Sequence, residues 1–215
     1  YGYNLKVFRE DGTVCEPDEK GIVGIVPPLP PGCLSTVWGN DERFVSTYFS
    51  LFRDPQVYSS FDWGIQDKDG YHYILGRTDD VINVAGHRLG TREIEEAIQG
   101  HPGIAEVAVV GVADPLKGQI PMAFAVVKDA GSISSPEKRI ELEKAVFKQV
   151  DDSLGAIARP SRVHFLTILP KTRSGKLLRR SIQALAEGRD PGDLTTIEDP
   201  AALEQLQLAL SFRAA

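Results

Sequence analysis

Five cationic side chains lie close together within LPKTRSGKLLRRSIQAL, residues 169–185: Lys171, Arg173, Lys176, Arg179 and Arg180. A helix is expected from about Gly175 to Ala186, and a helix start already carries partial positive charge. Its free N–H groups can bind an anion, Gly175 lets a ligand approach the backbone, and Lys176 adds a point charge. The segment therefore suits a phosphate, or the negative charge that develops at a reacting carboxylate and phosphate.

The charge pattern alone favours a plainer interpretation of this segment, because runs of charge usually lie on a solvated surface. Arg179 and Arg180 are interpreted as surface residues. The segment is not a phosphate loop of the G-x-x-x-x-G-K-[ST] type, since Leu177 follows Lys176 and no glycine lies five residues before Gly175. A stand-alone binding module with a basic helix is the alternative of a different class. The formal net charge of −6 argues against nucleic acid as its partner.

A second polar group lies in GRTDDVINVAGHRLG, residues 76–90. Asp79 and Asp80 either ligate a metal or form a turn, and the turn is favoured because aspartate suits turn positions. Arg77 and Arg88 either pair with carboxylates or bind a phosphate through two parallel hydrogen bonds. The sequence leaves both roles open for each arginine.

Single polar residues outside these segments give weaker signals. Asp62, in FDWG, either accepts hydrogen bonds from a sugar diol or is a buried structural carboxylate. His101 follows a helix end, where a lone histidine is more often structural than a ligand. His72, His87 and His101 lack the H-x-x-x-H spacing, so a zinc centre is not predicted.

The elements that carry these residues change in character near residues 78–80. Residues 3–8 and 21–26 have strand patterns, and hairpins are expected up to the break, while residues 43–52 fit a helix or a strand. From about residue 80 the order β-β-α-β-β-α-β-α is expected. The fold class is therefore α+β, with helices covering a short mixed sheet after a hairpin-rich β part.

The first helix after the break is expected in TREIEEAIQG, residues 91–100. Thr91 is its expected N-cap, and Gly100 ends it. Ile94, Ala97 and Ile98 share its buried face. The glutamates are placed toward solvent or the N-terminal turn: Glu93, Glu95 and Glu96. Further helices are expected from Pro136 to about Asp152 and over roughly residues 200–211.

Composition places the chain among ordinary globular proteins, with 215 residues, 42% hydrophobic and 25% charged. No apolar run has the roughly 20 residues that a membrane span needs, so no membrane partner is expected. Cys15 and Cys33 are too few for a disulfide scaffold, and a cytoplasmic location is expected.

Three segments carry a resemblance to a known family: YHYILGRTDDVINVAGHRLGTREIEEAI, AEVAVVGVADPLKGQIPMAFAV and LPKTRSGKLLRR. Together, and in this order, they resemble the C-terminal part of the AMP-forming acyl-CoA synthetases. TDDVINVAGHRLGTREIEE and EGRDPGDLTTIEDP resemble the propionate–CoA ligases most. The resemblance implies three parts: residues 1–78 from the end of a large adenylate-forming domain, 79–189 as a mobile C-terminal domain, and 190–215 as a tail with a short helix.

The resemblance also implies a two-step reaction, in which propionate and ATP give propionyl-adenylate and CoA then gives propionyl-CoA and AMP. By position, Lys176 matches the catalytic lysine of the first step. Asp62, Arg77 and Arg88 match nucleotide-binding residues, although Ser60-Phe61 replaces the usual Thr-Gly before Asp62.

Further positions match through the resemblance alone. Asp79 matches the hinge, while Ala85 and Gly86 match the CoA-binding face used in thioester formation. The matches to a Mg²⁺ site are Gln99, His101 and Ile104.

Several expectations follow from what the resemblance does not cover. The family's phosphate loop and acyl pocket lie upstream of the segments seen here, so the 215 residues alone are expected to be inactive. Acetate or another short-chain acid stays open as the substrate. Enzymes that acetylate and deacetylate Lys176 are expected partners, since acylation would remove the charge that the first step needs.

Overall fold

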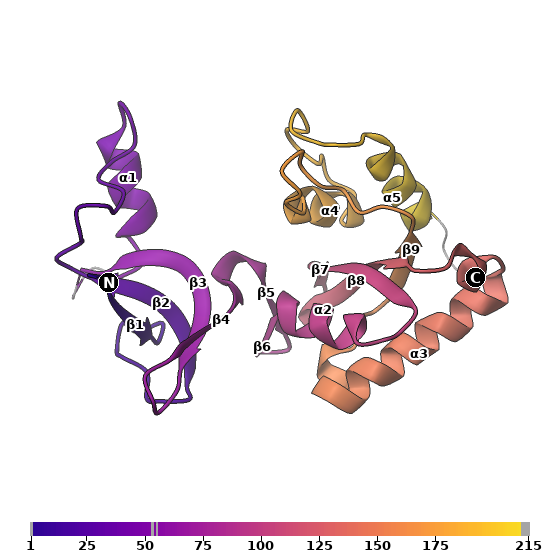
Figure 1. Ribbon diagram of the computed structural model, residues 1–215, viewed down its shortest axis with the longest axis horizontal. Coiled ribbons are helices and arrows are strands. Elements are labelled where there is room, and N and C mark those ends of the chain that lie inside the picture. The colour runs from indigo at the N-terminus through magenta and orange to yellow at the C-terminus, as the bar shows by residue number, and fades with distance from the viewer. Residues whose placement is uncertain (1, 53, 55, 212–215) are drawn as a thin grey trace. The chain divides into compact units, whose positions relative to one another are not determined.

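The structure is a computed structural model that describes residues 2–52, 54 and 56–211. It divides into two compact units, Tyr1–Asp79 and Asp80–Ala215. Figure 1 shows a separate sheet in each unit, β1–β4 in the first and β5–β9 in the second. The boundary falls within the short 3-10 helix η1, Thr78–Asp80.

The first unit is built on a four-stranded antiparallel sheet in the order β1-β2-β3-β4. Its strands are β1 (Asn4–Phe8), β2 (Lys20–Val26), β3 (Tyr58–Gln66) and β4 (His72–Arg77). The two strands expected from the sequence and the β3–β4 hairpin are confirmed. A small core of Phe8, Ile22, Phe52 and Val57 packs against the sheet.

The segment that fitted a helix or a strand forms a helix, α1 (Asp41–Tyr48). Asn40 caps it, because its side-chain oxygen accepts a hydrogen bond from the backbone N–H of Arg43 at 2.9 Å. The aromatic residues of this segment pack around Tyr58 on β3, whose ring stacks on Tyr48 at a centroid distance of 4.8 Å. Helix α1 is thereby attached to the sheet through aromatic contacts.

The second unit contains a mixed sheet in the order β6-β5-β8-β7, with β9 also paired to β8. Its strands are β5 (Val81–Val84), β6 (His87–Gly90), β7 (Ile104–Asp114), β8 (Gly118–Val127) and β9 (Val163–Leu166). Strand β9 runs parallel to β8, and the other pairs are antiparallel. The expected α+β class with a short mixed sheet is confirmed.

Helices cover both faces of this sheet, as Figure 1 shows. They are α2 (Thr91–Gln99), α3 (Pro136–Leu154), α4 (Arg179–Ala186) and α5 (Ala201–Ser211), with short 3-10 turns η2 (Ala130–Ile133) and η3 (Ala156–Ala158). Val107 and Val109 of β7 pack with α2 and α3, while Ala108 and Val110 pack with α4 and α5. The alternation of strand side chains thus divides the core into two layers.

Two helix starts differ from the sequence prediction. Helix α2 has Gly90 as its N-cap, and Thr91 is its first helical residue, so no side chain caps it. Helix α4 begins at Arg179 rather than at Gly175, because Gly175 has a left-handed backbone with φ of 81°. That conformation cannot continue a right-handed helix.

Side chains from the helices satisfy the open edge of β7, the last strand of the sheet. The N–H of Val109 donates to Glu95 on α2 at 2.9 Å. Farther along, Gln183 on α4 donates to the carbonyl of Gly111 at 2.8 Å, and the N–H of Ala113 donates to Glu187 at 3.0 Å. Edge strands need such cover, since unpaired backbone groups invite pairing with another chain.

The tail predicted for residues 190–215 packs as part of the second unit over its described residues, which end at 211. Leu206 of α5 is fully buried in the same core cluster as Ile182 of α4. His164 on β9 stacks on Phe124 at 5.2 Å, and its Nδ1–H donates to the carbonyl of Ala209 at 3.1 Å. Helix α5 is therefore a structural part of this domain.

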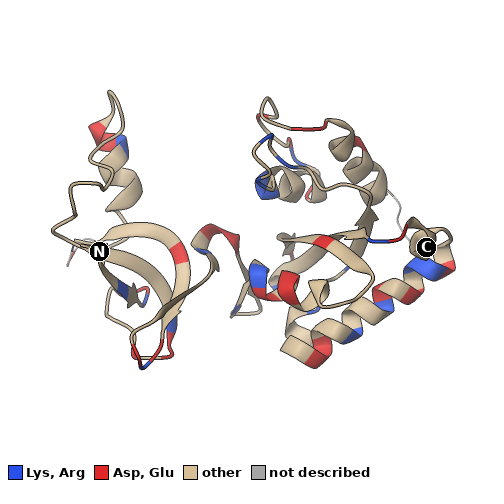
Figure 2. Ribbon diagram, viewed as in Figure 1, with Lys and Arg blue, Asp and Glu red and all other residues tan. Residues whose placement is uncertain are grey.

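Acidic and basic positions are interspersed along α3, as the red and blue ribbon segments in Figure 2 show. Among the described residues, no helix is both long enough and apolar enough to cross a membrane.

Acidification is expected to weaken the attachment of α5 through His164. Burial lowers the pKa of His164 below its ordinary value of 6.5, although the carbonyl of Ala209 and the charge of Glu143 act in the opposite direction. The unfolded chain then binds the proton more readily, so stability is complete above pH 6.5 and is lost as pH falls through the folded pKa.

The measurement is urea unfolding of the chain at about pH 7.5 and about pH 5.5. His164→Asn keeps a side-chain N–H for Ala209 but cannot titrate, so its loss of stability on acidification should be smaller. An equal loss in both proteins would show that other groups cause the pH dependence.

Candidate active site

Lys176 lies in a tight hairpin, not at a helix start. Lys171 pairs with Leu177, and the backbone N–H of Thr172 donates to the carbonyl of Lys176 at 2.8 Å. The loop closes with a bond from Gly175 N–H to the carbonyl of Thr172, also 2.8 Å, and Gly175 supplies the left-handed conformation. We call residues 171–177 the lysine hairpin.

The cations of this segment have different environments. The Lys171 ammonium lies 2.6 Å from Glu106 on β7. Lys176 is exposed beside the loop, and within the described residues its ammonium has no ion pair. Figure 2 shows the blue cationic positions around this hairpin and the start of α4. The hairpin thus presents one unpaired ammonium near its tip.

Arg179 is not a surface residue, which corrects the sequence interpretation. One terminal nitrogen of its guanidinium donates to both carboxylate oxygens of Glu95, at 2.8 and 2.7 Å. The exposed fractions are 28% for the Arg179 side chain and 11% for that of Glu95. This partly buried ion pair joins α4, two residues after the lysine hairpin, to α2.

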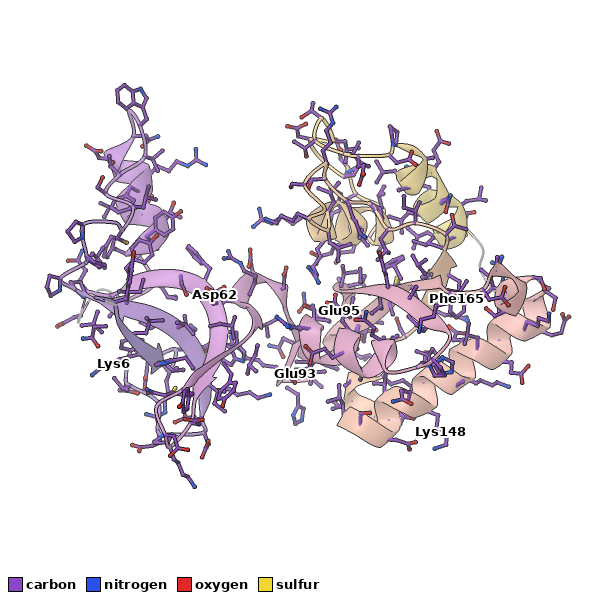
Figure 3. All side chains as sticks on the ribbon, in the orientation of Figure 1. Lys6, Asp62, Glu93, Glu95, Lys148 and Phe165 are labelled. Carbon is purple, nitrogen blue, oxygen red and sulfur yellow. The ribbon has the colours of Figure 1, made fainter. Side chains whose placement is uncertain are left out.

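Glu95 was also placed on the wrong side of its helix. It lies on the buried face of α2 with Thr91, Ile94 and Ile98, and Figure 3 labels it there. Burial raises the pKa of Glu95, while the bonds from Arg179 and from the N–H of Val109 act to lower it. The carboxylate therefore depends on both partners to stay charged inside the unit.

Asp62 and Arg77 face each other across β3 and β4 in the first unit, with Asp62 labelled in Figure 3. Their side chains approach to 3.9 Å, which is longer than a hydrogen bond. Arg77 also donates to the carbonyl of Ser60 at 3.2 Å and lies over the ring of Phe61, 5.5 Å from its centre. The Asp62 carboxylate is only partly buried and lies near the Arg77 guanidinium, and its oxygens can accept further hydrogen bonds.

The backbone next to Asp62 is irregular. The register between β2 and β3 shifts at Val23, and Phe61 has a left-handed φ of 60°. Thr78 holds this bulge by donating to the carbonyl of Phe61 at 3.2 Å. Glycine occupies such positions without strain, so phenylalanine here is a costly choice that the neighbouring contacts stabilise.

Asp79, the expected hinge, is the last residue of the first unit. Its carboxylate lies 3.1 Å from Nε of Arg77. The structure therefore brings three of the predicted residues together in this unit: Asp62, Arg77 and Asp79.

Three other predicted residues share the β5–β6 hairpin of the second unit. Ala85 and Gly86 form its two-residue turn, with φ of 50° and 87°. The side-chain oxygen of Asn83 accepts a hydrogen bond from the N–H of Gly86 at 3.0 Å, and the N–H of Ala85 donates to the backbone carbonyl of Lys117 at 2.8 Å. Arg88 lies on β6 opposite Asn83 and is exposed. No atom lies within 4 Å of a methyl group added to Gly86, so its surface is open.

The residues predicted to bind Mg²⁺ lie together in the turn from α2 to β7. Gln99 donates to the carbonyl of Ala105 at 3.4 Å, and the carbonyl of His101 accepts from the N–H of Ile104 at 3.1 Å. This donor set contains no carboxylate, which Mg²⁺ ordinarily needs, so it fits the ion poorly. No group of three His, Cys, Asp or Glu side chains among the described residues is placed to hold a metal.

Two further contacts at the lysine hairpin could not be predicted from the sequence: the Lys171–Glu106 ion pair and the pairing of Thr172 with Ile197. For Glu95 a signal existed. Thr91, Ile94, Glu95 and Ile98 follow the i, i+3, i+4, i+7 spacing of one helix face.

Part of the second unit matches a known protein family. Residues 93–176 match the family described as AMP-binding enzyme C-terminal domain. These residues belong to that family. The match runs from α2 to Lys176. It therefore includes both Glu95 and Lys176.

Relatives with similar sequences extend the resemblance over nearly the whole chain. The chain is 60% identical to the propionate–CoA ligase of Escherichia coli over 211 residues, which are 98% of this chain and 33% of the relative. It is 45% identical to the acetyl-coenzyme A synthetase of Pyrobaculum aerophilum over 97% of this chain and 30% of that one. The predicted resemblance to acyl-CoA synthetases is confirmed, and the chain spans about a third of these relatives' length.

Solved structures agree. The acetoacetyl-CoA synthetase from Streptomyces lividans has the same fold, with a TM-score of 0.80 and 21% identity over 99% of this chain and 31% of that one. ATP-bound MatB from Rhodopseudomonas palustris gives a TM-score of 0.69 with 26% identity over 85% of this chain and 34% of that one.

The partly buried ion pair yields a prediction about stability. Arg179→Met leaves the Glu95 carboxylate buried without its cation, and should lower the free energy of unfolding by about 3 kcal/mol. Adding Glu95→Gln removes the uncompensated charge while its amide oxygen still accepts from Val109. The double variant should therefore be more stable than Arg179→Met alone.

Urea unfolding of the two single variants and the double variant measures this coupling. Arg173→Met, at an exposed position of the lysine hairpin, is the matched control and should change stability little. If the double variant loses the sum of the two single losses, the pair is not coupled as its geometry indicates.

Proposed function

We propose that this chain is the C-terminal part of an AMP-forming acid–thiol ligase whose substrates are propionate, ATP and CoA. The 60% identity to a propionate–CoA ligase supports the reaction and the acid. The single structural observation that favours a catalytic role is the exposed Lys176 near the tip of the lysine hairpin, where its ammonium has no ion pair among the described residues. The 45% identity to an acetyl-coenzyme A synthetase keeps acetate as the alternative acid.

In the first step a carboxylate oxygen of the acid attacks the α-phosphorus of ATP, and the bond to the β-phosphate oxygen breaks. The products are the acyl-adenylate and pyrophosphate. Negative charge develops on the oxygens around the α-phosphate, and Lys176 would stabilise it through its ammonium. An exposed ammonium without an ion pair suits this role, since the charge need not leave another partner first.

In the second step the CoA sulfur attacks the acyl carbon, AMP departs and the thiol loses its proton. We assign Ala85 and Gly86 to the surface that the CoA arm contacts, because the turn is open and carries no bulky side chain. Arg88, on the strand that follows, would bind a nucleotide phosphate.

Asp62 and Arg77 would bind the nucleotide from the first unit. The carboxylate of Asp62 suits a ribose diol, and Arg77 fixes the bulge on which it lies. Asp79 would act as the hinge between the two steps, which its place at the unit boundary supports. We derive no step through Mg²⁺.

Acetylation of Lys176 would switch off the first step, because it removes the ammonium charge. The exposure of Lys176 supports access by enzymes that add or remove the acyl group. A cytoplasmic location, where acyl donors and thiols are available, completes this proposal.

Lys176→Ala in the full-length enzyme is expected to lower acid-dependent pyrophosphate release by about a thousandfold, since a charge at the reacting centre is lost. Thioester formation from supplied propionyl-adenylate should persist. Lys148→Ala, on the exposed surface of α3, is the control and should affect neither step. Equal loss of both half-reactions would indicate a structural role for Lys176.

The 215-residue chain alone is expected to release no pyrophosphate from ATP and propionate. Its described residues supply the Lys176 hairpin and the Asp62–Arg77 pair, but the acyl pocket is assigned to the rest of the ligase. Measurable turnover by the purified chain would contradict this division of the active site.

A further inference from the structure

A segment beyond the family match pairs with the lysine hairpin. The N–H of Arg173 donates to the carbonyl of Thr196 at 3.1 Å, and the N–H of Glu198 donates to the carbonyl of Lys171 at 2.9 Å. Between these bonds Thr172 pairs with Ile197 in antiparallel orientation. The first arm of the hairpin therefore lies between Leu177 on one side and residues 194–198 on the other. We call residues 194–198 the brace.

The brace is itself firmly attached. The side chain of Ile197 is buried, with 9% exposed, and its N–H donates to the carbonyl of Leu194 at 3.0 Å. Before the brace, the buried hydroxyl of Ser181 on α4 donates to the carbonyl of Pro191 at 2.9 Å. The brace is therefore tied to the same helix that follows the lysine hairpin.

After the brace, α5 holds the chain to the sheet. Gln205 accepts from both the N–H and the hydroxyl of Thr167, at 3.2 and 2.7 Å, and Leu206 is fully buried. Attachments on both sides of residues 194–198 mean that the brace cannot follow a movement of the hairpin freely. It can therefore restrain the hairpin.

The tip of the hairpin is held by bonds within the loop, including one from the N–H of Lys176 to the hydroxyl of Thr172 at 3.1 Å, and the brace adds a restraint from outside the loop. Its loop is exposed from Arg173 to Lys176 and includes a glycine, which adds backbone freedom. Lys171 is held by Glu106 at the base of the hairpin. Without the brace, the N–H of Arg173 and the carbonyl of Lys171 would face water.

We propose that the brace is a positioning element for Lys176, which fixes the first arm of the lysine hairpin through two backbone hydrogen bonds. This inference rests on the proposed function for the catalytic role of Lys176. It extends the site beyond residues 93–176, since the brace and its anchors on α5 lie outside the family match. Loss of the brace should impair the adenylating step in particular.

Glu198→Pro tests the brace directly. Proline removes the N–H that donates to Lys171, and it favours an extended backbone at the preceding residue, as Ile197 already has in its bridge. Glu198→Ala is the matched control, because it removes the exposed carboxylate and keeps the N–H.

The first readout is amide hydrogen exchange in the 215-residue chain, which does not depend on catalysis. Glu198→Pro should accelerate exchange of the Thr172 and Arg173 amides about tenfold, the effect of losing one backbone hydrogen bond. Glu198→Ala should leave these rates unchanged. Unchanged rates in Glu198→Pro would overturn the brace, whatever Lys176 does.

The second readout is the pair of half-reactions in the full-length enzyme. Glu198→Pro should lower acid-dependent pyrophosphate release about tenfold, in line with the same lost bond, and leave thioester formation from supplied propionyl-adenylate intact. Equal loss in both half-reactions, or no loss in the first, would overturn a positioning role.

Lys176→Ala measured beside these variants separates the two hypotheses. If Lys176→Ala retains the first half-reaction, the proposed role of the lysine fails. If Lys176→Ala loses it but Glu198→Pro does not, only the brace fails as a positioning element. Thermal unfolding of Glu198→Pro and Glu198→Ala provides the structural comparison, and a collapse of both half-reactions with a large drop in Tm would count against specific positioning.

Discussion

The open edge of β7 is the constraint on which the arrangement of the second unit depends. Its backbone groups alternate between the sheet and the outside, and the outward ones need partners. At Val109 the partner is Glu95, whose carboxylate accepts a hydrogen bond from the backbone N–H. This carboxylate is buried and therefore requires a cation. Arg179 supplies it at the first turn of α4. The position of the start of α4, next to the end of the lysine hairpin, therefore depends on a strand N–H that has no partner within the sheet and is bound by Glu95 instead.

Residues with positive φ lie at or next to several of the candidate functional residues. Gly175 closes the lysine hairpin, Ala85 and Gly86 form the β5–β6 turn, and Phe61 precedes Asp62. Left-handed conformations cost non-glycine residues about 1–2 kcal/mol, so they persist only where surrounding contacts stabilise them. For Phe61 these contacts come from Arg77 and Thr78. The strained residue Phe61 and the carboxylate of Asp62 are thus adjacent in one bulge.

The sequence predicted the order of strands and helices well, because hydrophobic period distinguishes the two kinds of element over long segments. It failed at Glu95, where charge outweighed the spacing that placed the residue on the buried face. It failed again at Gly175, because the amphipathic pattern of α4 extends backward into the hairpin. The pairing of Thr172 with Ile197 could not be predicted, since a bridge of one residue between distant segments leaves no periodic signal.

The cations of residues 169–185 also differ in whether they form ion pairs. Lys171 and Arg179 are matched to carboxylates of the same unit, at 2.6 and 2.7 Å. Either would have to leave a charge partner before binding a phosphate, and for Arg179 that would leave Glu95 buried and uncompensated. Lys176 has no such partner among the described residues, so its attraction for an anion is undiminished. The two paired cations are therefore structural contacts, Lys171 at the start of the hairpin and Arg179 at the start of α4.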